Sequence, residues 1–154
     1  MRKIIYVGAD SAGFTLKEEL AEHLKDAGYE VRDMGTDSTA SCHYPDFAAA
    51  VCHGVLEANG EAYGLLVCGT GIGMSMCANK YHGIRAAVVS DTYSAKMTRA
   101  HNDANVICIG ARVIGPSLAW EILKSFLSAE FEDGGRHRIR VDMMTDIEKN
   151  QQNK

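Results

Sequence analysis

The most informative stretch of this 154-residue chain joins an apolar run to a glycine-rich turn and reads Tyr63-Gly64-Leu65-Leu66-Val67-Cys68-Gly69-Thr70-Gly71-Ile72-Gly73-Met74-Ser75. The apolar run up to Cys68 predicts a strand that is covered on both faces. Three glycines then alternate with Thr70 and Ile72, so the backbone can turn sharply and point several N–H groups at an anion. A helix that starts just after this turn would add its positive end. The stretch therefore predicts an anion pocket that carries its own reactive sulfur.

Strands and helices alternate along the rest of the chain. Apolar residues recur at helical spacing between the apolar runs, and Pro45 and Pro116 suit the first turns of two such helices. The helix that Pro116 opens is expected to turn Leu118, Ile122 and Phe126 inward. Alternation of this kind predicts an α/β fold with a mostly parallel sheet covered by helices on both faces. The expected strands are Ile4 to Ala9, Glu30 to Met34, Tyr63 to Cys68, Arg85 to Ser90 and Asn105 to Ile109.

The last segment, at about residues 134–150, begins at a glycine pair and is expected to form an arm and a helix. Val141, Met144 and Ile147 give this helix an apolar stripe, which can pack on a neighbouring subunit or on its own domain. Arg136 and Arg140 are four residues apart, so a helix places both guanidinium groups on one face. That face can grip a phosphate dianion, and the alternative is a solvated basic surface.

Composition and length limit the function classes. The chain fits one compact domain over residues 1–154, and its net charge of −4 gives no reason to expect a nucleic-acid partner. Its apolar runs are too short for a signal peptide or a membrane span, so no membrane partner is expected. Five cysteines without CxxC spacing argue against a disulfide scaffold and a structural zinc site. This cysteine usage favours a cytoplasmic location.

Two nucleotide-binding motifs do not fit the glycine-rich turn. A Walker loop needs Gly-Lys followed by Ser or Thr, whereas Gly73 is followed by Met74-Ser75. A dinucleotide-binding loop needs G-x-G-x-x-G, and here the third glycine comes one residue too early. The turn therefore favours another kind of anion.

Several reactive side chains are expected beyond the carboxyl ends of the strands, where open parallel sheets bind ligands. Asp10-Ser11 follows the first strand, Cys68 ends the third, and Arg112 follows the fifth. His101-Asn102 precedes the fifth strand and belongs at its other end unless the helix terminus curls back. An acid, a thiol, a hydroxyl, an imidazole and arginines around an anion hole suit proton transfer on a phosphorylated sugar. The alternatives are that Cys68 is a small core residue and that Asp10 caps a helix.

A set of short motifs in a fixed order carries a resemblance to a known family. These motifs are Gly8-Ala9-Asp10, Gly35-Thr36, Tyr44-Pro45-Asp46, Cys68 to Gly73, Ala78-Asn79-Lys80, Gly83-Ile84-Arg85-Ala86, His101 to Asn105 and Gly135-Arg136-His137. Together they resemble the type B ribose-5-phosphate isomerases, in the family that includes the galactose-6-phosphate isomerase subunits. The resemblance implies a three-layer α/β/α sandwich on a five-stranded parallel sheet, a homodimer or dimer of dimers, and no metal or organic cofactor.

The resemblance also implies roles for matching positions. Cys68 would be the base that moves a proton between C2 and C1 of the open-chain sugar, and Thr70 would relay protons between O1 and O2. His101, from a neighbouring subunit, would assist opening of the furanose ring. Backbone N–H groups of Gly69, Gly71 and Gly73 would bind the enediolate oxygen. The remaining matching positions are ligands of the sugar (Asp10, Tyr44 and Asn102) and of its phosphate (Arg112, Arg136, His137 and Arg140). Ser11, next to Asp10, is also expected to contact the substrate.

Three positions refine the resemblance. Another branch of the family uses a glutamate where this chain has Met74, so the chain resembles the cysteine branch. Ser11 stands where the family usually has histidine, and His43 stands where many members have aspartate. The first change removes an imidazole contact to the substrate, and His43 either replaces it from the loop or is a surface histidine.

Three functional hypotheses follow. The first is an isomerase of ribose 5-phosphate and ribulose 5-phosphate. The second is an isomerase with the same mechanism that acts on a hexose 6-phosphate, of the galactose or allose type, or on another sugar. The third is a non-catalytic sugar-phosphate binding protein, but binding alone needs no thiol base, and Cys68, Thr70 and His101 are all present.

Overall fold

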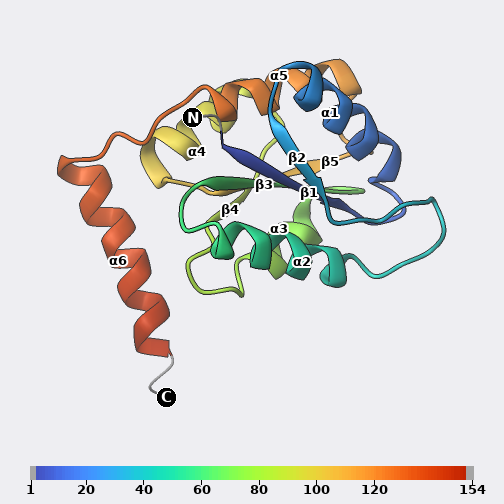
Figure 1. Cartoon of the computed structure of the whole chain (residues 1–154). Coiled ribbons are helices and arrows are strands. Elements are labelled where there is room, and N and C mark those ends of the chain that lie inside the picture. The colour runs from blue at the N-terminus through green and yellow to red at the C-terminus, as the bar shows by residue number, and fades with distance from the viewer. Residues whose placement is uncertain (1–2, 152–154) are drawn as a thin grey trace.

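The computed structural model describes residues 3–151, and these residues form five strands and six helices in the predicted alternation (Figure 1). Each predicted strand is present, the first with both predicted ends, and no end of the others moves by more than two residues. In chain order the elements are β1 (Ile4–Ala9), α1 (Phe14–Asp26), β2 (Glu30–Asp33), α2 (Tyr44–Glu57), β3 (Ala62–Cys68), α3 (Ile72–Ala78), β4 (Ala86–Val88), α4 (Thr92–Asn102), β5 (Val106–Gly110), α5 (Pro116–Leu127) and α6 (Gly135–Gln151).

The sheet is parallel throughout and has the strand order β2-β1-β3-β5-β4. The strand that precedes the glycine-rich turn, β3, lies in the centre, and its residues from Gly64 to Cys68 are all buried. β4 lies at an edge and is shorter than predicted. The N–H of Arg85 donates to the side chain of Asn105 (2.8 Å), so Arg85 is not part of β4, which begins at Ala86. The prediction of a parallel sheet is confirmed.

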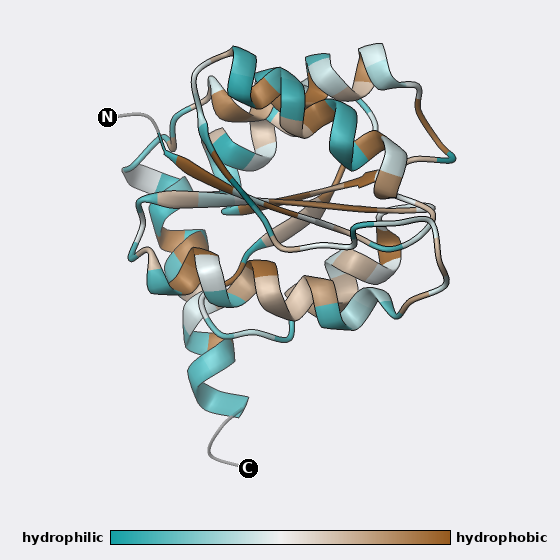
Figure 2. Ribbon diagram, turned by 45° about the vertical axis from the view of Figure 1, so that its right-hand side comes forward, coloured by the Kyte–Doolittle hydropathy of each residue, from teal (hydrophilic) through white to brown (hydrophobic). Residues whose placement is uncertain are grey.

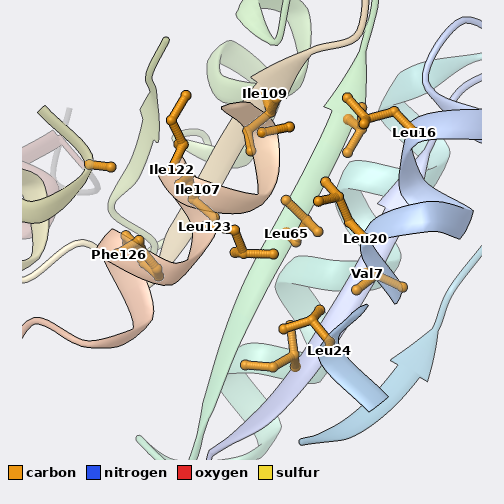
Figure 3. Close-up of a cluster of buried hydrophobic side chains, with 14 of the residues drawn as sticks. Val7, Leu16, Leu20, Leu24, Leu65, Ile107, Ile109, Ile122, Leu123 and Phe126 are labelled. Carbon is orange, nitrogen blue, oxygen red and sulfur yellow. The ribbon is translucent and has the colours of Figure 1, made fainter. Parts of the chain in front are cut away.

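Helices cover both faces of the sheet and make two separate cores. α1, α4 and α5 cover one face, and α2 and α3 cover the other (Figure 1). Figure 3 shows Leu20 and Leu24 of α1 on one side of Leu65 of β3 and Phe126 of α5 on the other, all on the first face. All four side chains are fully buried. Burial of each such side chain stabilises the fold by about 1.5–3 kcal/mol.

The predicted inward face of α5 is partly wrong. Ile122 and Phe126 are fully buried, but Leu118 is 43% exposed. The buried positions are Ala119, Ile122, Leu123 and Phe126, which follow helical spacing from Ala119. These four residues determine which face of α5 packs on the sheet, and Leu118 lies outside that face.

α6 extends away from the rest of the chain (Figures 1 and 2). Of its predicted apolar stripe, Val141 is buried against the chain, whereas Met144 and Ile147 are 39% and 59% exposed. Ile139, Met143 and Ile147 instead form an exposed stripe at intervals of four residues. Within residues 3–151, no helix has the length and apolar character that crossing a bilayer requires.

Candidate active site

The glycine-rich turn lies at the carboxyl end of β3, as predicted, and is tied to the segment that follows β5. The carbonyl of Cys68 accepts from the N–H of Ala111 (2.9 Å), and the carbonyl of Gly69 accepts from the N–H of Arg112 (3.0 Å). α3 begins directly after Gly71. The turn is therefore held between the central strand, its neighbour and a helix.

The thiol of Cys68 faces a backbone donor from this turn. The N–H of Gly71 donates to its Sγ at 3.1 Å, and the side chain is 5% exposed. Gly71 makes this contact with a positive φ of 77°, a conformation that residues with a Cβ adopt at a cost. The sulfur therefore has a hydrogen-bond donor within the turn, and the thiolate is the form of cysteine that accepts a proton.

Two other buried cysteines lack such a turn. Burial raises the pKa of the Cys52 thiol to about 12 and raises the pKa of Cys108 well above its ordinary value. Both therefore stay protonated at neutral pH. Cys68 is also part of the buried core, as the alternative of a small core residue predicts. It differs from Cys52 and Cys108 in the backbone N–H that Gly71 donates to its sulfur.

Asp10 lies beside the sulfur-bearing turn because its N–H donates to the carbonyl of Val67 (3.2 Å), one residue before Cys68. Its Oδ1 accepts from the N–H groups of Ala12 and Gly13, both at 3.0 Å. The carboxylate therefore closes the turn that leads into α1, whose N-cap is Gly13, so Asp10 is not itself the cap of the helix. Ser11 is half-buried within the same entry turn.

Tyr44, Thr70 and Arg112 lie around the same turn. The ring of Tyr44 lies against Gly73, where an added Cβ would come within 2.9 Å of the ring. The Thr70 hydroxyl accepts from the N–H of Ile72 (3.3 Å), and the side chain is exposed. The guanidinium of Arg112 is next to Gly69. An aromatic ring, a hydroxyl and a cation thus surround the backbone donors, as expected from the sequence.

The remaining predicted residues form a second group at the opposite end of the sheet. His101 and Asn102 end α4, just before β5 begins, whereas Cys68 pairs with Gly110 at the end of β5. The imidazoles of His101 and His137 are stacked with ring centres 4.2 Å apart. The helix terminus therefore does not curl back toward Cys68 within one chain.

The first turns of α6 bring further charge to this second group. Arg136 and Arg140 are exposed near His137, which is 9% exposed. Partial burial lowers the pKa of His137, and the nearby His101 and Arg136 lower it further, so its imidazole is neutral at pH 7. The second group therefore combines the positive charges of Arg136 and Arg140 with the neutral imidazole of His137, which suits an anionic ligand.

Sequence reasoning missed Glu132, whose carboxylate lies 3.8 Å from Nε2 of His101 and 3.6 Å from Nε2 of His137. Glu132 precedes α6 in an irregular segment, and no periodic pattern marks it. Its position follows from tertiary packing, since its N–H donates to the carbonyl of Ala100 at the end of α4 (2.9 Å).

The family model described as Ribose/Galactose Isomerase matches residues 5–144. The chain belongs to this family. A relative within it is Ribose-5-phosphate isomerase B of Escherichia coli, 48% identical over 149 residues, which cover 96% of this chain and 97% of the relative. Another is the D-erythrulose-4-phosphate isomerase of Pectobacterium atrosepticum, 48% identical over 132 residues, or 85% of this chain and 86% of the relative.

A solved structure shares the family fold over nearly the whole chain. Clostridium thermocellum Ribose-5-Phosphate Isomerase B superposes with a TM-score of 0.93 at 47% identity, covering 96% of this chain and 99% of its own. The ribose/galactose isomerase fold is therefore shown for this chain. The relatives' names include sugars of different length, so family membership by itself does not select the sugar.

Proposed function

We propose that this chain interconverts ribose 5-phosphate and ribulose 5-phosphate as an aldose–ketose isomerase, through an enediolate. The observation that carries the proposal is the Cys68 thiol with the N–H of Gly71 at 3.1 Å from its sulfur, inside a turn rich in backbone donors. The similarity to ribose-5-phosphate isomerases supports the choice of sugar. Binding alone requires no base at this position.

The chemistry explains why a thiolate and backbone donors occur together. A proton on carbon beside a carbonyl is far less acidic than a thiol, so a base removes it only when the new oxyanion is stabilised. Loss of one such donor typically raises the barrier by about 3 kcal/mol. The turn from Gly69 to Gly73 supplies donors beside the base.

One proton moves between C2 and C1 of the sugar, and a second moves between O2 and O1. The Cys68 thiolate takes the proton from C2 of the open-chain aldose, the C–H electron pair forms the C1=C2 bond, and the carbonyl oxygen O1 becomes the oxyanion. The Cys68 thiol then returns the proton to C1 while electrons from O2 form the ketose carbonyl. Thr70, exposed beside the turn, passes the hydroxyl proton from O2 to O1.

A second copy of the chain completes the site. His101, Asn102, Arg136, His137 and Arg140 lie at the end of the sheet away from Cys68, so one chain does not bring them to its own turn. In a two-fold dimer each copy gives its second group to the other's turn, and two identical sites result. The exposed stripe of α6 supplies apolar surface for such a contact.

Within this shared site, His101 assists ring opening, and the cations hold the phosphate. Arg136 and Arg140 come from the second copy and Arg112 from the first. A phosphate held far from the reacting carbons orients C1 and C2 at the base and lowers the entropic cost of the reaction. The chemistry uses only protein groups, and the five free cysteines suit a reducing cytoplasm.

A second candidate is an isomerase of the same mechanism that acts on another sugar phosphate. Ser11 in place of the usual histidine and the similarity to a D-erythrulose-4-phosphate isomerase favour it. A substrate panel separates the two candidates. The purified chain is assayed in chelator-containing buffer with ribose 5-phosphate, D-erythrulose 4-phosphate, and galactose and allose 6-phosphates. We expect the highest kcat/KM with ribose 5-phosphate, and a higher value with any other sugar contradicts the first candidate.

A further inference from the structure

Three side chains that ligate transition metals converge beside the second group of site residues. His101 at the end of α4, Glu132 in the following irregular segment and His137 in α6 each offer a ligand atom, and these atoms all lie within 4.8 Å of one another. Glu132 and His137 are only five residues apart, whereas His101 comes from α4, 31 residues before Glu132. The fold therefore brings His101 to the other two.

The separations match ligands of one ion better than they match hydrogen bonds. Glu132 Oε1 lies 3.8 Å from His101 Nε2, and Glu132 Oε2 lies 3.6 Å from His137 Nε2. Hydrogen bonds between such atoms are shorter than about 3.2 Å. Ligand atoms about 2.1 Å from a tetrahedral zinc ion lie about 3.4 Å apart, so a small inward movement suffices.

The rings must also turn, because they are stacked with an angle of 5° between their planes and a shared ion has to lie in both planes. Side chains of His101 and Glu132 are 34% and 59% exposed, which leaves room for this rotation. The His137 side chain, 11% exposed, is the fixed member.

The segment that carries Glu132 is held in place from both sides. The N–H of Glu132 donates to the carbonyl of Ala100, the residue before His101 (2.9 Å). Arg138 pairs with Asp133 (2.7 Å) and lies over the ring of Phe131 (4.8 Å). These contacts fix the backbone on each side of the carboxylate, so little order has to be created when an ion binds.

We propose that His101, Glu132 and His137 bind a divalent transition-metal ion of the Zn²⁺ type, one per chain, and that this ion inhibits the enzyme. Two imidazoles and one carboxylate leave a fourth position open and favour Zn²⁺ over Mg²⁺ or Ca²⁺, which prefer oxygen ligands. The positive charges of Arg136 and Arg140 disfavour any cation at this place. Coordination by the two imidazoles offsets this repulsion for a transition-metal ion, but not for an ion that binds through charge alone. The ion binds Nε2 of His101, so this nitrogen no longer exchanges a proton with the sugar and ring opening stops. Only the inhibition rests on the proposed function.

Binding is tested directly on the full-length protein after metal removal by a chelator and dialysis. Isothermal titration with Zn²⁺ alone is expected to show one site per chain. His101→Ala and His137→Ala are each expected to remove it, and Glu132→Ala to weaken it by at least about tenfold. Glu130→Ala and His82→Ala are the matched controls and keep the wild-type affinity. Absence of the site in the wild type, or its persistence in both histidine variants, overturns the proposal.

The same titration with Co²⁺ identifies the ligand type, since the chain has five free cysteines. Nitrogen and oxygen ligands give only weak visible bands, as the proposal requires. An intense sulfur-to-cobalt charge-transfer band that accompanies the first equivalent places the ion on thiols and overturns the proposal.

The functional consequence is read from Glu132→Ala, because Glu132 has no part in the proposed catalysis. Without metal, this variant is expected to turn over ribose 5-phosphate within about twofold of the wild type, and its Zn²⁺ concentration for half-inhibition rises by at least about tenfold. Equal inhibition of both proteins overturns the inhibitory role. Absence of isomerase activity in metal-free wild-type protein contradicts the proposed function instead, while the titrations still decide the metal site.

Discussion

The N–H of Gly71 connects the base and the anion pocket, because it points at the sulfur of Cys68 from within the same turn (3.1 Å). A thiolate without a donor in a buried place is costly, as the raised pKa values of Cys52 and Cys108 illustrate. The sequence predicted this relationship because strand, cysteine and glycines are contiguous. It could not predict the partner of Glu132, which is set by packing between α4 and α6.

Replacing Cys68 with alanine should abolish turnover while the sugar phosphate still binds. The side chain removed is the base, whereas the backbone donors and cations that hold the ligand remain. We expect kcat to fall by at least about 100-fold, with ribulose 5-phosphate binding by calorimetry within a few-fold of the wild type. Cys77→Ala, on the same side of the sheet, is the control with normal activity. Undiminished isomerisation by Cys68→Ala would remove the sulfur from the mechanism.

Replacing Gly71 with alanine should destabilise the fold and slow the reaction. The positive φ of 77° costs an alanine about 1–2 kcal/mol, and its Cβ would lie 3.0 Å from the backbone of Ile109. Gly60→Ala is the control, since Gly60 has φ 88° but nothing within 4 Å of an added Cβ. Urea unfolding should show the larger loss for Gly71→Ala. Equal losses would mean that the close approach to Ile109 is unimportant.

His137 should make stability depend on pH. Its pKa is lowered in the folded chain, so between that value and about 6.5 the unfolded chain binds the extra proton and the folded chain does not. The free energy of unfolding therefore falls as the pH is lowered from 7.5 to 5. His137→Asn should give a shallower fall in chelator-containing buffer, measured by urea unfolding. Equal slopes in the wild type and His137→Asn would contradict the lowered pKa.

The helix α6 is confirmed, but periodicity leaves open where its apolar stripe of Val141, Met144 and Ile147 packs. Only Val141 is buried within one chain, so packing of the stripe on a neighbouring subunit stays a prediction. A helix that leaves the body of its own chain has no single buried face, so hydrophobic spacing does not determine its orientation. The same limit explains Leu118 on α5, where small Ala119 takes the buried position.

The exposed stripe of α6 should be needed for association of two copies. Ile139 and Ile147 are 60% and 59% exposed on this stripe, and a charge at either position would be desolvated in an interface. Ile139→Asp combined with Ile147→Asp should shift the protein to a monomer, measured by light scattering after size exclusion. Aspartate at Leu56, which is exposed on α2, is the control. A dimer that survives the double change would place the interface elsewhere.

The whole molecule divides the proposed site between the two ends of one parallel sheet. Alternating apolar runs were enough to predict the sheet, and the strand ends located Asp10, Cys68 and Arg112 correctly. The position of His101 before β5 also predicted that it lies away from Cys68. How two chains combine depends on surfaces that no periodic pattern describes.

Subunit mixing tests the shared site most directly. Cys68→Ala and His101→Ala proteins, each expected to be inactive with ribose 5-phosphate, are unfolded together in equal amounts and refolded. Half of the dimers are then hybrids, and each hybrid has one site with both native residues, so activity should return to about one quarter of the wild-type value. Each variant refolded alone is the control. If the mixture stays inactive while light scattering shows dimers, Cys68 and His101 do not act in a site shared between two chains.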